Sequence, residues 1–393
     1  MATLPLSPSA ETAILEETPS SRPREDSASA EMSGSDVYEL IRACLSHRSE
    51  SARRSALQSF LDAGIDWPLV QQEAQRHRVL LLLYRALEDV LGPRLPSSLH
   101  EQIREHRRGV RIRNTFVIQE LGRIAQHFEA VDLAFLAMKG PVLAKTAYGD
   151  IALRHSVDAD MFVPREHFSE VESALRDLGY EYTEERKAVA DWRKALSLYL
   201  DGQWEFSRGR SFTLDVHTRL MPPGYPFPSD FQRFSKGARS VQLSDKVSVP
   251  GFAPEDQLLI LAHHGIKNQW RALRHVADIA AVIRGSEDLD WELLRSQAEK
   301  MRATRVLKLG LCMAHDLLEV TLPLPIKKWA LGAFIRDVAA PMKTYLRSRS
   351  QKSSLAYGER VQLQLATKDT IMGQIRYGVH SLLQHFWSTL LKP

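Results

Sequence analysis

The sequence predicts an α+β fold in which a mixed-sheet core is flanked by a helical region on each side. Three observations predict it. Apolar residues recur at three- and four-residue spacing from Asp36 to about Ala130, which is the period of a helix. From Val131 onwards, short apolar runs bounded by Gly and Asp-Gly turn signals alternate with helical segments. Beyond Pro254 the helical period returns. We therefore expect an acidic tail (1–35), an N-terminal helical region (36–130), a sheet-containing core (131–250) and a C-terminal helical domain (251–393).

The N-terminal tail is rich in Ser, Pro, Glu and Ala and has few large apolar side chains, so it is expected to be disordered. Residues 1–36 hold seven acids against two basic residues, Arg22 and Arg24, so this segment has a charge of −5. Because the whole chain has a net charge of +4, the remaining residues carry +9. A mildly basic body suits a phosphate-bearing ligand, but it is weak evidence for nucleic-acid binding.

The first helical region begins where Tyr38, Ile41 and Leu45 recur along one face. One or two further helices cover Leu69–Leu91, and a long helix that Ser97 can cap follows. Four basic residues share one face of the long helix: Arg104, Arg107, Arg108 and Arg111. They form either a solvated surface or a face beside an anionic substrate.

The core begins with a buried strand over 133–138 that ends at Lys139-Gly140, and Pro141 opens the next helix. A second strand covers Asp158–Val163, and Pro164 starts a helix that Gly179 ends. The strands expected after that helix are 180–183, 196–200, 203–207 and 211–217. A proline-rich loop over 220–228, which contains Pro222-Pro223-Gly224 (222–224), closes the core.

The C-terminal domain is expected to be helical throughout, with helices over 258–268, 271–284, 291–301 and 307–320 and two or three more up to Leu391. Asp288 and Asp290 run into Trp291 without a strand pattern, so they are interpreted as a helix cap. The last segment, 375–391, is amphipathic and is expected to pack on its own domain.

Composition excludes several classes of protein. The chain is 44% apolar and 25% charged, as is usual for a soluble globular protein. Cys44 and Cys312 lack paired-thiol spacing, which excludes a disulfide scaffold and a cysteine-based zinc finger and favours a reducing compartment. There is neither an apolar run of about 18 residues nor a secretory signal. We expect a cytoplasmic protein without a membrane partner.

Three aspartates carry the chemistry that the sequence predicts. Asp158 and Asp160 are two residues apart on a strand, so both carboxylates face the same side. Two such charges are costly unless a cation bridges them, and oxygen ligands suit Mg²⁺ or Mn²⁺. If the strand of Asp215 is adjacent, this residue completes a carboxylate triad of the kind that holds two divalent ions. Asp215 could also accept the proton of the nucleophile.

The Lys139-Gly140 turn fits the same scheme. Glycine at a strand-to-helix turn allows the backbone to approach a phosphate closely, and the following helix offers free N–H groups. Lys139 can bind a phosphate as a point charge. Arg154 and Ser156 lie just before Asp158, where they either contact a triphosphate or brace the loop.

These motifs together resemble the uncharacterised nucleotidyltransferase family of bacteria, a branch of the DNA polymerase β-like nucleotidyltransferase superfamily. The resemblance covers about 133–294, and its matching residues are Lys139-Gly140, Tyr148-Gly149-Asp150, Arg154, Ser156, Asp158, Asp160, Leu214–His217, Pro254–Asp256, His264, Trp270, Leu273 and Asp278. It implies a minimal nucleotidyltransferase core and two-metal transfer from an NTP such as ATP, with Asp158, Asp160 and Asp215 as catalytic, metal-binding acids. One departure is that Lys139-Gly140-Pro141 stands where the superfamily usually has Gly-Ser.

The histidines allow several interpretations. His263, His264, His275 and Asp278 lie on two predicted helices and could hold a metal, as in a His-Asp phosphohydrolase. The resemblance instead implies that this helix pair packs beside the catalytic core. His264, Lys267 and Arg274 would then face a base or phosphate, unless His264 and Asp278 bond each other. His217 shares a strand face with Asp215 and could hold that carboxylate or meet the acceptor.

The expected function is Mg²⁺-dependent transfer of a nucleotidyl group from an NTP to a hydroxyl or phosphate of a small-molecule, peptide or protein acceptor. One alternative keeps the fold and changes the donor, as in phosphoryl or sugar transfer that tailors a peptide or small-molecule natural product. Another is a toxin-like or non-catalytic nucleotide-binding module. A nucleic-acid polymerase ranks lower, because the chain shows no zinc finger, helix-hairpin-helix glycine motif or basic stripe interleaved with aromatics.

Overall fold

The computed structural model describes residues 33–348, except 157, 184–201, 210–211, 222–226 and 229, together with residues 357–390. Most of the predicted tail, the predicted strand 196–200 and the loop 222–224 lie outside the described residues.

The N-terminal region is helical, as predicted. Its helices are α1 (Gly34–Leu45), α2 (Glu50–Ala63), α3 (Trp67–Arg76) and α4 (Leu80–Leu91), followed by the short η1 (Gly92–Arg94) and by α5 (Ser97–Ala130). Ser33, Ser49 and Asp66 cap the first three helices through their side chains. The predicted cap at Ser97 is wrong, because α5 begins at this residue and its N-cap is Pro96, without a side-chain bond.

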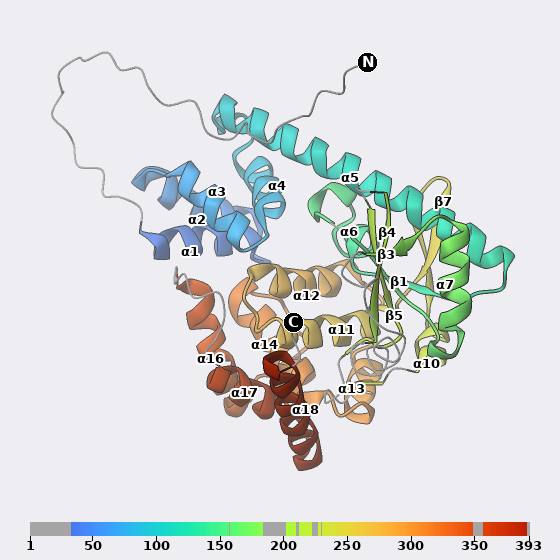
Figure 1. The fold of residues 1–393 in the computed structure, drawn as a ribbon. Helices are drawn as coiled ribbons and strands as arrows, with labels where there is room; N and C mark the ends of the chain where they lie inside the picture. The colour runs from blue at the N-terminus through green and yellow to red at the C-terminus, as the bar shows by residue number, and fades with distance from the viewer. Residues whose placement is uncertain are drawn as a thin grey trace, which may run out of the picture. The chain divides into compact units, whose positions relative to one another are not determined.

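The centre of the chain forms a seven-stranded sheet in the order β3-β4-β5-β2-β1-β7-β6 (Figure 1). Its strands are β1 (Leu136–Met138), β2 (Ala159–Phe162), β3 (Glu181–Tyr182), β4 (Gln203–Arg208), β5 (Phe212–His217), β6 (Arg239–Ser244) and β7 (Val247–Gly251). Strand β2 is parallel to β5 and β1 is parallel to β7, whereas the other neighbours are antiparallel. The predicted α+β class with a mixed sheet is therefore confirmed.

Helices connect and cover the strands. These are α6 (Gly140–Tyr148), η2 (Ile151–Leu153), η3 (Arg165–His167), α7 (Phe168–Asp177) and α10 (Phe231–Ser235). Pro141 lies in the first turn of α6, as predicted. The β6–β7 hairpin was not predicted, and it extends the sheet beyond β1.

The two faces of the sheet bury different residues. Met161, Val216 and Phe206 point to one face, where they join α5 and α7 in a core. On the other face Met138 and Phe162 pack into a second core that contains α11 and α12. Because side chains alternate along a strand, Asp160 and Asp215 must also face this second side. The pleat of the sheet thus turns the predicted acids towards α11 and α12.

The C-terminal part is helical as predicted, and α11, α12 and α14 pack against one another beside the sheet (Figure 1). The helices are α11 (Pro254–Lys267), α12 (Leu273–Gly285), α13 (Trp291–Lys300), α14 (Thr304–Leu318), α15 (Leu324–Ala330), α16 (Ala333–Arg347), α17 (Tyr357–Ala366) and α18 (Ile371–Leu390). Asp290 caps α13 by accepting a bond from the Leu293 N–H at 2.9 Å, as predicted.

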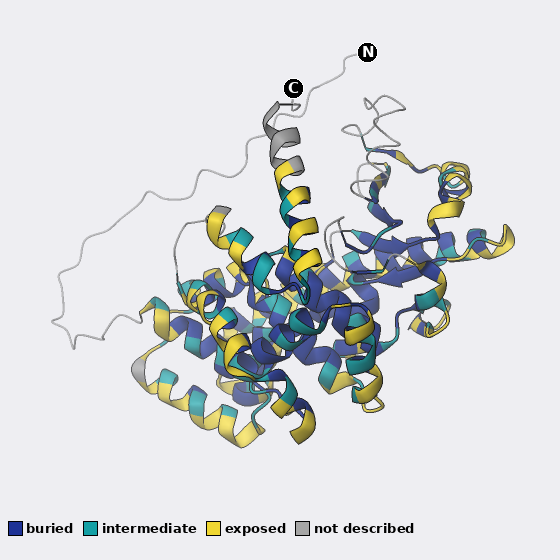
Figure 2. Cartoon of the chain, turned by 90° about the horizontal axis from the view of Figure 1, so that it is seen from below, coloured by how far each residue is buried: buried dark blue, intermediate teal, exposed yellow. Residues whose placement is uncertain are grey.

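Helix α18 packs on α17 of its own domain, as expected, but only along one side. Ile375, Val379 and Leu382 are more than half exposed, although Tyr377 and His380 are buried. Figure 2 shows the alternation of exposed and buried residues along the described length of this helix. No helix in the described part of the chain is long and apolar enough to cross a membrane.

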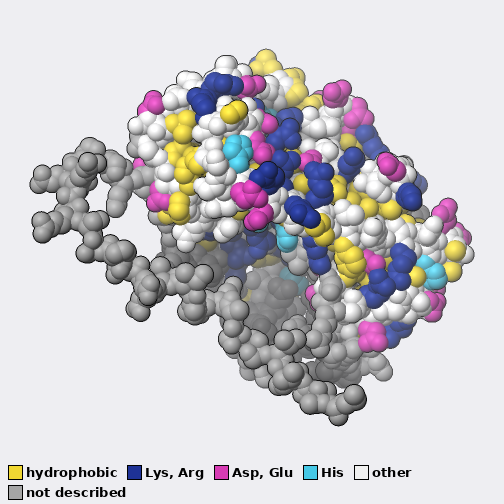
Figure 3. Space-filling view, turned by 90° about the horizontal axis from the view of Figure 1, so that it is seen from above, with side chains coloured by type: hydrophobic (Ala, Val, Ile, Leu, Met, Phe, Trp, Pro, Cys, Tyr) yellow, Lys and Arg dark blue, Asp and Glu magenta, His cyan; other side chains and the backbone are white. Residues whose placement is uncertain are grey.

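The basic face of α5 lies at the surface and is partly neutralised by acids. Arg107 pairs with Glu88 at 2.7 Å, Arg111 pairs with Asp150 at 3.3 Å, and Arg104 pairs with Glu101. Figure 3 shows basic and acidic side chains mixed on the face that α5 crosses. These pairs favour a solvated surface over a substrate-binding face.

Candidate active site

The site is built where two parallel strands place aspartates side by side. In the ladder between β2 and β5, Asp160 lies directly opposite Asp215, and Phe162 lies opposite His217. The predicted adjacency of these strands is confirmed. Apolar residues on the opposite face of both strands lock the register, because a slip by one residue would bury the acids in the α5–α7 core.

Three buried side chains converge at this point. The ligand atoms of Asp160, Asp215 and His217 all lie within 4.8 Å of one another, an arrangement that can hold a metal ion. Within the described residues it is the one group of three or more His, Cys, Asp or Glu that converges in this way. Asp158 lines the same cavity but stands outside the group, so its predicted part in the metal site stays a prediction.

The two central carboxylates have different partners. Lys139 Nζ lies 3.2 Å from Asp160 Oδ1, and His217 Nε2 lies 3.0 Å from the same oxygen. Gln203 Nε2 donates to Asp215 Oδ2 at 2.7 Å. Asp215 Oδ1 is buried without a hydrogen-bond partner among the described residues. Asp215 therefore has an oxygen free to bind a ligand, whereas Asp160 is held by two neighbours.

The pKa values of the carboxyls follow from these contacts. Burial, and then the charges of Asp160 and Asp158, raise the pKa of Asp215 to about 7. Burial and Asp160 also raise the pKa of Asp158. Burial acts in the same direction on Asp160, but Lys139 and His217 outweigh it and hold its pKa below the usual range. Near neutral pH, Asp160 is charged and Asp215 is partly protonated.

The turn after β1 places Lys139 at the edge of the site. Lys139 and Gly140 both have left-handed backbone angles, with φ of 52° and 40°. A non-glycine residue in this region is strained, a condition that clusters at functional sites. Ser156 lies beside the turn, since a Cβ on residue 140 would be 3.5 Å from its Oγ. That hydroxyl is buried and lacks a partner among the described residues.

A buried chain of polar groups holds the turn from behind. Arg154 bonds both oxygens of Asp278, at 3.1 and 3.2 Å, and donates to the Gly140 carbonyl at 3.4 Å. The Tyr148 hydroxyl donates to Asp278 Oδ1 at 2.8 Å. Of the two roles predicted for Arg154, these contacts favour bracing the loop.

The helix pair α11–α12 closes the site from the opposite side. The His264 ring lies against the ring of His275, with centroids 5.6 Å apart. The suggested bond between His264 and Asp278 is not the one observed, because Asp278 bonds Arg154 and Tyr148. His263 contacts the Leu259 carbonyl at 2.9 Å and packs against the ring of Phe227. These contacts favour a structural role for His263 over a role as a metal ligand.

All the predicted site residues line one cavity of about 300 Å³ between the sheet and the helix pair. We call it the active-site cavity. Its predicted lining residues are Lys139, Gly140, Arg154, Ser156, Asp158, Asp160, Asp215, His217, His264 and Lys267. Arg78, His155 and Gln203 also line it and were not named from the sequence, whereas His275, which lines it too, was considered only as a metal ligand on the helix pair. The alternation of buried Trp204 and Phe206 could have placed Gln203 on the site face.

Comparison with known proteins agrees with this geometry at the level of the family. The model of a family described as "Uncharacterised nucleotidyltransferase" matches residues 63–319, a longer span than the motifs alone indicated. A search of curated proteins finds no match.

Two solved structures share limited similarity with the chain. The crystal structure of ANT(2″)-Ia in complex with adenylyl-2″-tobramycin is 14% identical, covers 47% of this chain and 96% of its own, and has a TM-score of 0.33. The solution structure of the antibiotic-resistance factor ANT(2″)-Ia is also 14% identical, covers 48% and 93%, and has a TM-score of 0.34. The family match covers well over half of the sequence. The chain therefore belongs to the uncharacterised nucleotidyltransferase family and is a transferase.

Proposed function

We propose that this enzyme transfers a nucleotidyl group from an NTP to a hydroxyl or phosphate acceptor with the help of Mg²⁺. One observation carries the proposal. Asp160 and Asp215 lie opposite each other on parallel strands, and an unpartnered oxygen of Asp215 is buried in a cavity that also contains Lys139. Carboxylates beside a phosphate-binding cation are the chemistry that nucleotidyl transfer requires.

The residues present fit a divalent cation. Two buried carboxylates that face each other repel, and a cation between them removes this cost. Oxygen donors suit Mg²⁺ or Mn²⁺, and Asp158, Asp160 and Asp215 would hold two such ions. Bound ions would lower the pKa of the attacking hydroxyl and neutralise charge on the triphosphate. The His217 contact fixes the orientation of Asp160, as partners of metal ligands commonly do.

The donor phosphates would be held at the start of α6. Lys139 supplies a positive charge, and the first N–H groups of the helix can donate to phosphate oxygens. The turn lacks the serine that the superfamily usually places there. The unpartnered Ser156 hydroxyl beside Gly140 supplies an equivalent donor from a neighbouring loop. Lys267 and Arg274 line the same cavity and extend the positive surface towards the helix pair.

In the proposed reaction one P–O bond forms and one P–O bond breaks. The acceptor oxygen attacks the α-phosphorus of the NTP and forms a new P–O bond, while the bond to pyrophosphate breaks. Pyrophosphate leaves with the electron pair. The proton of the acceptor goes to Asp215, whose Oδ1 is buried in the cavity without a hydrogen-bond partner among the described residues.

Residues from two predicted regions meet in the site, because α11 supplies His264 and Lys267 to a cavity whose carboxylates lie in the core. We propose 131–250 as the catalytic core and 251–393 as a domain that completes the nucleotide site. Cys44 and Cys312 are free and buried, in keeping with a reducing compartment, so we propose a cytoplasmic enzyme.

The first experiment measures the melting temperature with each NTP in Mg²⁺ or in EDTA. It compares wild type with Asp160→Asn and with Asp245→Asn, an exposed aspartate in the turn between β6 and β7 that does not line the cavity and serves as the matched control. A nucleotide at 100 times its Kd adds about 2.7 kcal/mol of stability. We expect a Mg²⁺-dependent rise with one NTP in wild type and Asp245→Asn, and none in Asp160→Asn. An equal rise in Asp160→Asn, or no rise with any NTP, would reject the proposal.

A further inference from the structure

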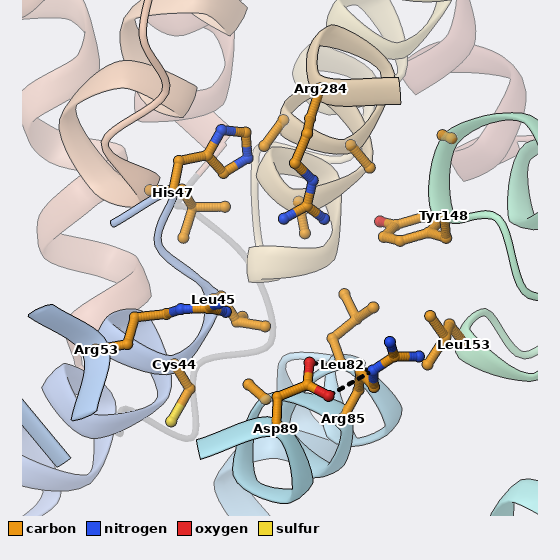
Figure 4. A pocket seen from close by; sticks show the side chains of 16 residues that line it. Cys44, Leu45, His47, Arg53, Leu82, Arg85, Asp89, Tyr148, Leu153 and Arg284 are labelled. Carbon is orange, nitrogen blue, oxygen red and sulfur yellow. Dashed lines mark hydrogen bonds and ion pairs between the residues drawn. The ribbon is translucent and has the colours of Figure 1, made fainter. Parts of the chain in front are cut away.

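A second cavity, of about 330 Å³, lies among the N-terminal helices, α6 and α12 (Figure 4). Residues from α1, α2, α4, α6, α12 and α14 line it. It contains Arg53, Arg85 and Arg284, and we call it the arginine pocket. Tyr148 separates the two cavities, because its ring lines the arginine pocket while its hydroxyl bonds Asp278 in the wall of the active-site cavity.

The arginine pocket carries uncompensated positive charge. Arg85 pairs with Asp89, the one carboxylate in the lining, at 2.9 and 3.1 Å. Arg53 and Arg284 have no ion pair or side-chain hydrogen bond to another described residue, and Arg53 Nε is buried without a partner. Figure 4 shows both side chains reaching into the pocket, Arg284 from α12 and Arg53 from α2. Arg284 is exposed at the mouth of the pocket and Arg53 is half-buried, so both guanidinium groups are accessible to a ligand that enters from solvent.

The pKa values of two groups in the lining, His47 and Arg284, reflect the positive charge of the pocket. Burial, followed by the charges of Arg284 and Arg53, lowers the pKa of His47 to about 4. Partial burial, and then the charge of Arg53, also lower the pKa of Arg284, although its side chain is exposed at the mouth of the pocket. An anion between the two arginines would offset both costs, since guanidinium groups match phosphate oxygens in a bidentate fashion.

The remaining lining is apolar. Leu45, Leu82, Leu153 and Leu318 form one part, and alanines of α12 form another. A cavity with an apolar wall and a few convergent polar groups has the character of a small-molecule site, and its volume lies at the lower end of the usual range of roughly 300–1,000 Å³. The wall would hold the carbon body of a ligand whose charged group lies at the arginines.

We propose that the arginine pocket binds a small organic phosphomonoester, with its phosphate between Arg53 and Arg284 and its carbon body against the leucine and alanine wall. A phosphate dianion matches the two guanidinium groups that lack a partner. The Tyr148–Asp278–Arg154 chain stands between this ligand and the active-site cavity. The pocket is therefore a site separate from the one proposed for the nucleotide, and it does not depend on that proposal.

Isothermal titration calorimetry in EDTA tests the assignment, with phenyl phosphate as the probe and inorganic phosphate and phenol as comparisons. The key variant is Arg53→Gln/Arg284→Gln. Its matched control is Arg54→Gln/Arg295→Gln, since Arg54 pairs with Glu50 and Arg295 pairs with Glu299 at the surface. A third variant, Lys139→Gln, removes the phosphate-binding charge of the active-site cavity.

We expect wild type, the matched control and Lys139→Gln to bind phenyl phosphate more tightly than inorganic phosphate and not to bind phenol. In Arg53→Gln/Arg284→Gln the Kd should rise at least about tenfold, in line with the loss of charge-assisted hydrogen bonds. Its melting temperature without ligand should not fall, because the substitutions remove repulsion. Unchanged binding in this variant, loss of binding in Lys139→Gln, or equal affinity for phosphate and phenyl phosphate would overturn the proposal.

Discussion

Asp160 and Asp215 lie opposite each other in the β2–β5 ladder, yet only Asp160 has cationic and histidine partners. Asp215 receives one hydrogen bond, from the neutral amide of Gln203. The two carboxyl groups therefore differ in their partners and in their pKa values before any ligand binds. The charge of Asp160 is fixed by Lys139, whereas the charge of Asp215 depends on pH and on what enters the cavity.

This inequality predicts how the stability of the metal-free protein varies with pH. The pKa of Asp215 is raised from 3.8 to about 7, so the folded state binds the proton more tightly than the unfolded state. The stability gained from this proton is present below pH 4 and is lost as the pH rises through 7. At 1.36 kcal/mol per pH unit, the charged carboxylate costs up to about 4 kcal/mol at pH 8.

Asp215→Asn removes that cost. In EDTA at pH 8 we expect urea unfolding to show that this variant is more stable than wild type, with a difference that shrinks towards pH 4. Asp245→Asn, in the exposed turn between β6 and β7, should follow wild type at both pH values, because its charge does not act on Asp215. If Asp215→Asn were less stable than wild type at pH 8, the carboxylate would have a structural role.

Metal binding should depend on pH for the same reason. A cation must displace the proton of Asp215, so below pH 7 the affinity for Mn²⁺ should fall by about tenfold per pH unit. Mn²⁺ titrations between pH 5.5 and 8.5 measure this slope. In Asp215→Asn the affinity should be weaker and the slope absent, and a slope that survived in this variant would assign the proton to another group.

Lys139 should contribute to binding of the donor phosphates. Lys139→Gln removes the charge at the start of α6, and we expect kcat/KM for the NTP to fall by about 10²-fold, as is typical for loss of one electrostatic contact in the transition state. The control is Lys145→Gln, an exposed lysine on the same helix that does not line the cavity. Equal activity of both variants would remove Lys139 from the proposed mechanism.

The sequence predicted the placement of the two central aspartates better than the edges of the sheet. Asp160 and Asp215 could be placed because each lies in a short strand whose alternate residues are apolar, so strand period alone fixes their face. The hairpin of β6 and β7 was missed, although Val241, Leu243 and Val249 alternate on either side of a turn. It pairs with β1, which lies about 100 residues earlier, and nothing local in the sequence indicates such a partner.

The brace behind the turn could not be predicted for a related reason. Arg154, Asp278 and Tyr148 come from three separate elements, and their bonds depend on how α12 packs against α6. Charge and spacing left two roles open for Arg154, contact with a phosphate or bracing of the loop, and suggested that Asp278 pairs with His264. Several partners were chemically suitable for Arg154 and Asp278, and the packing of α12 against α6 determines which of them bond.

The brace should make a measurable contribution to folding. Asp278→Asn leaves Arg154 as a buried charge without its ion pair, and we expect urea unfolding to show a loss of about 3–5 kcal/mol. Tyr148→Phe removes one hydrogen bond from the same carboxylate and should cost about 1 kcal/mol. If both variants lost the same small amount, Arg154 would be satisfied by other groups, and the brace would not hold the Lys139-Gly140 turn.

The last prediction concerns Asp158, which lines the cavity but stands apart from the converging group of Asp160, Asp215 and His217. In a two-metal mechanism Asp158 is needed to hold the second ion and not the first. Electron paramagnetic resonance of Mn²⁺ with the bound NTP should therefore count two ions in wild type and one in Asp158→Asn. The variant should keep its fold and nucleotide binding and lose turnover, because one ion still holds the donor but the attacking hydroxyl is no longer activated. Two ions in Asp158→Asn would show that the second site is built without this residue, and a single ion in wild type would contradict the two-metal mechanism.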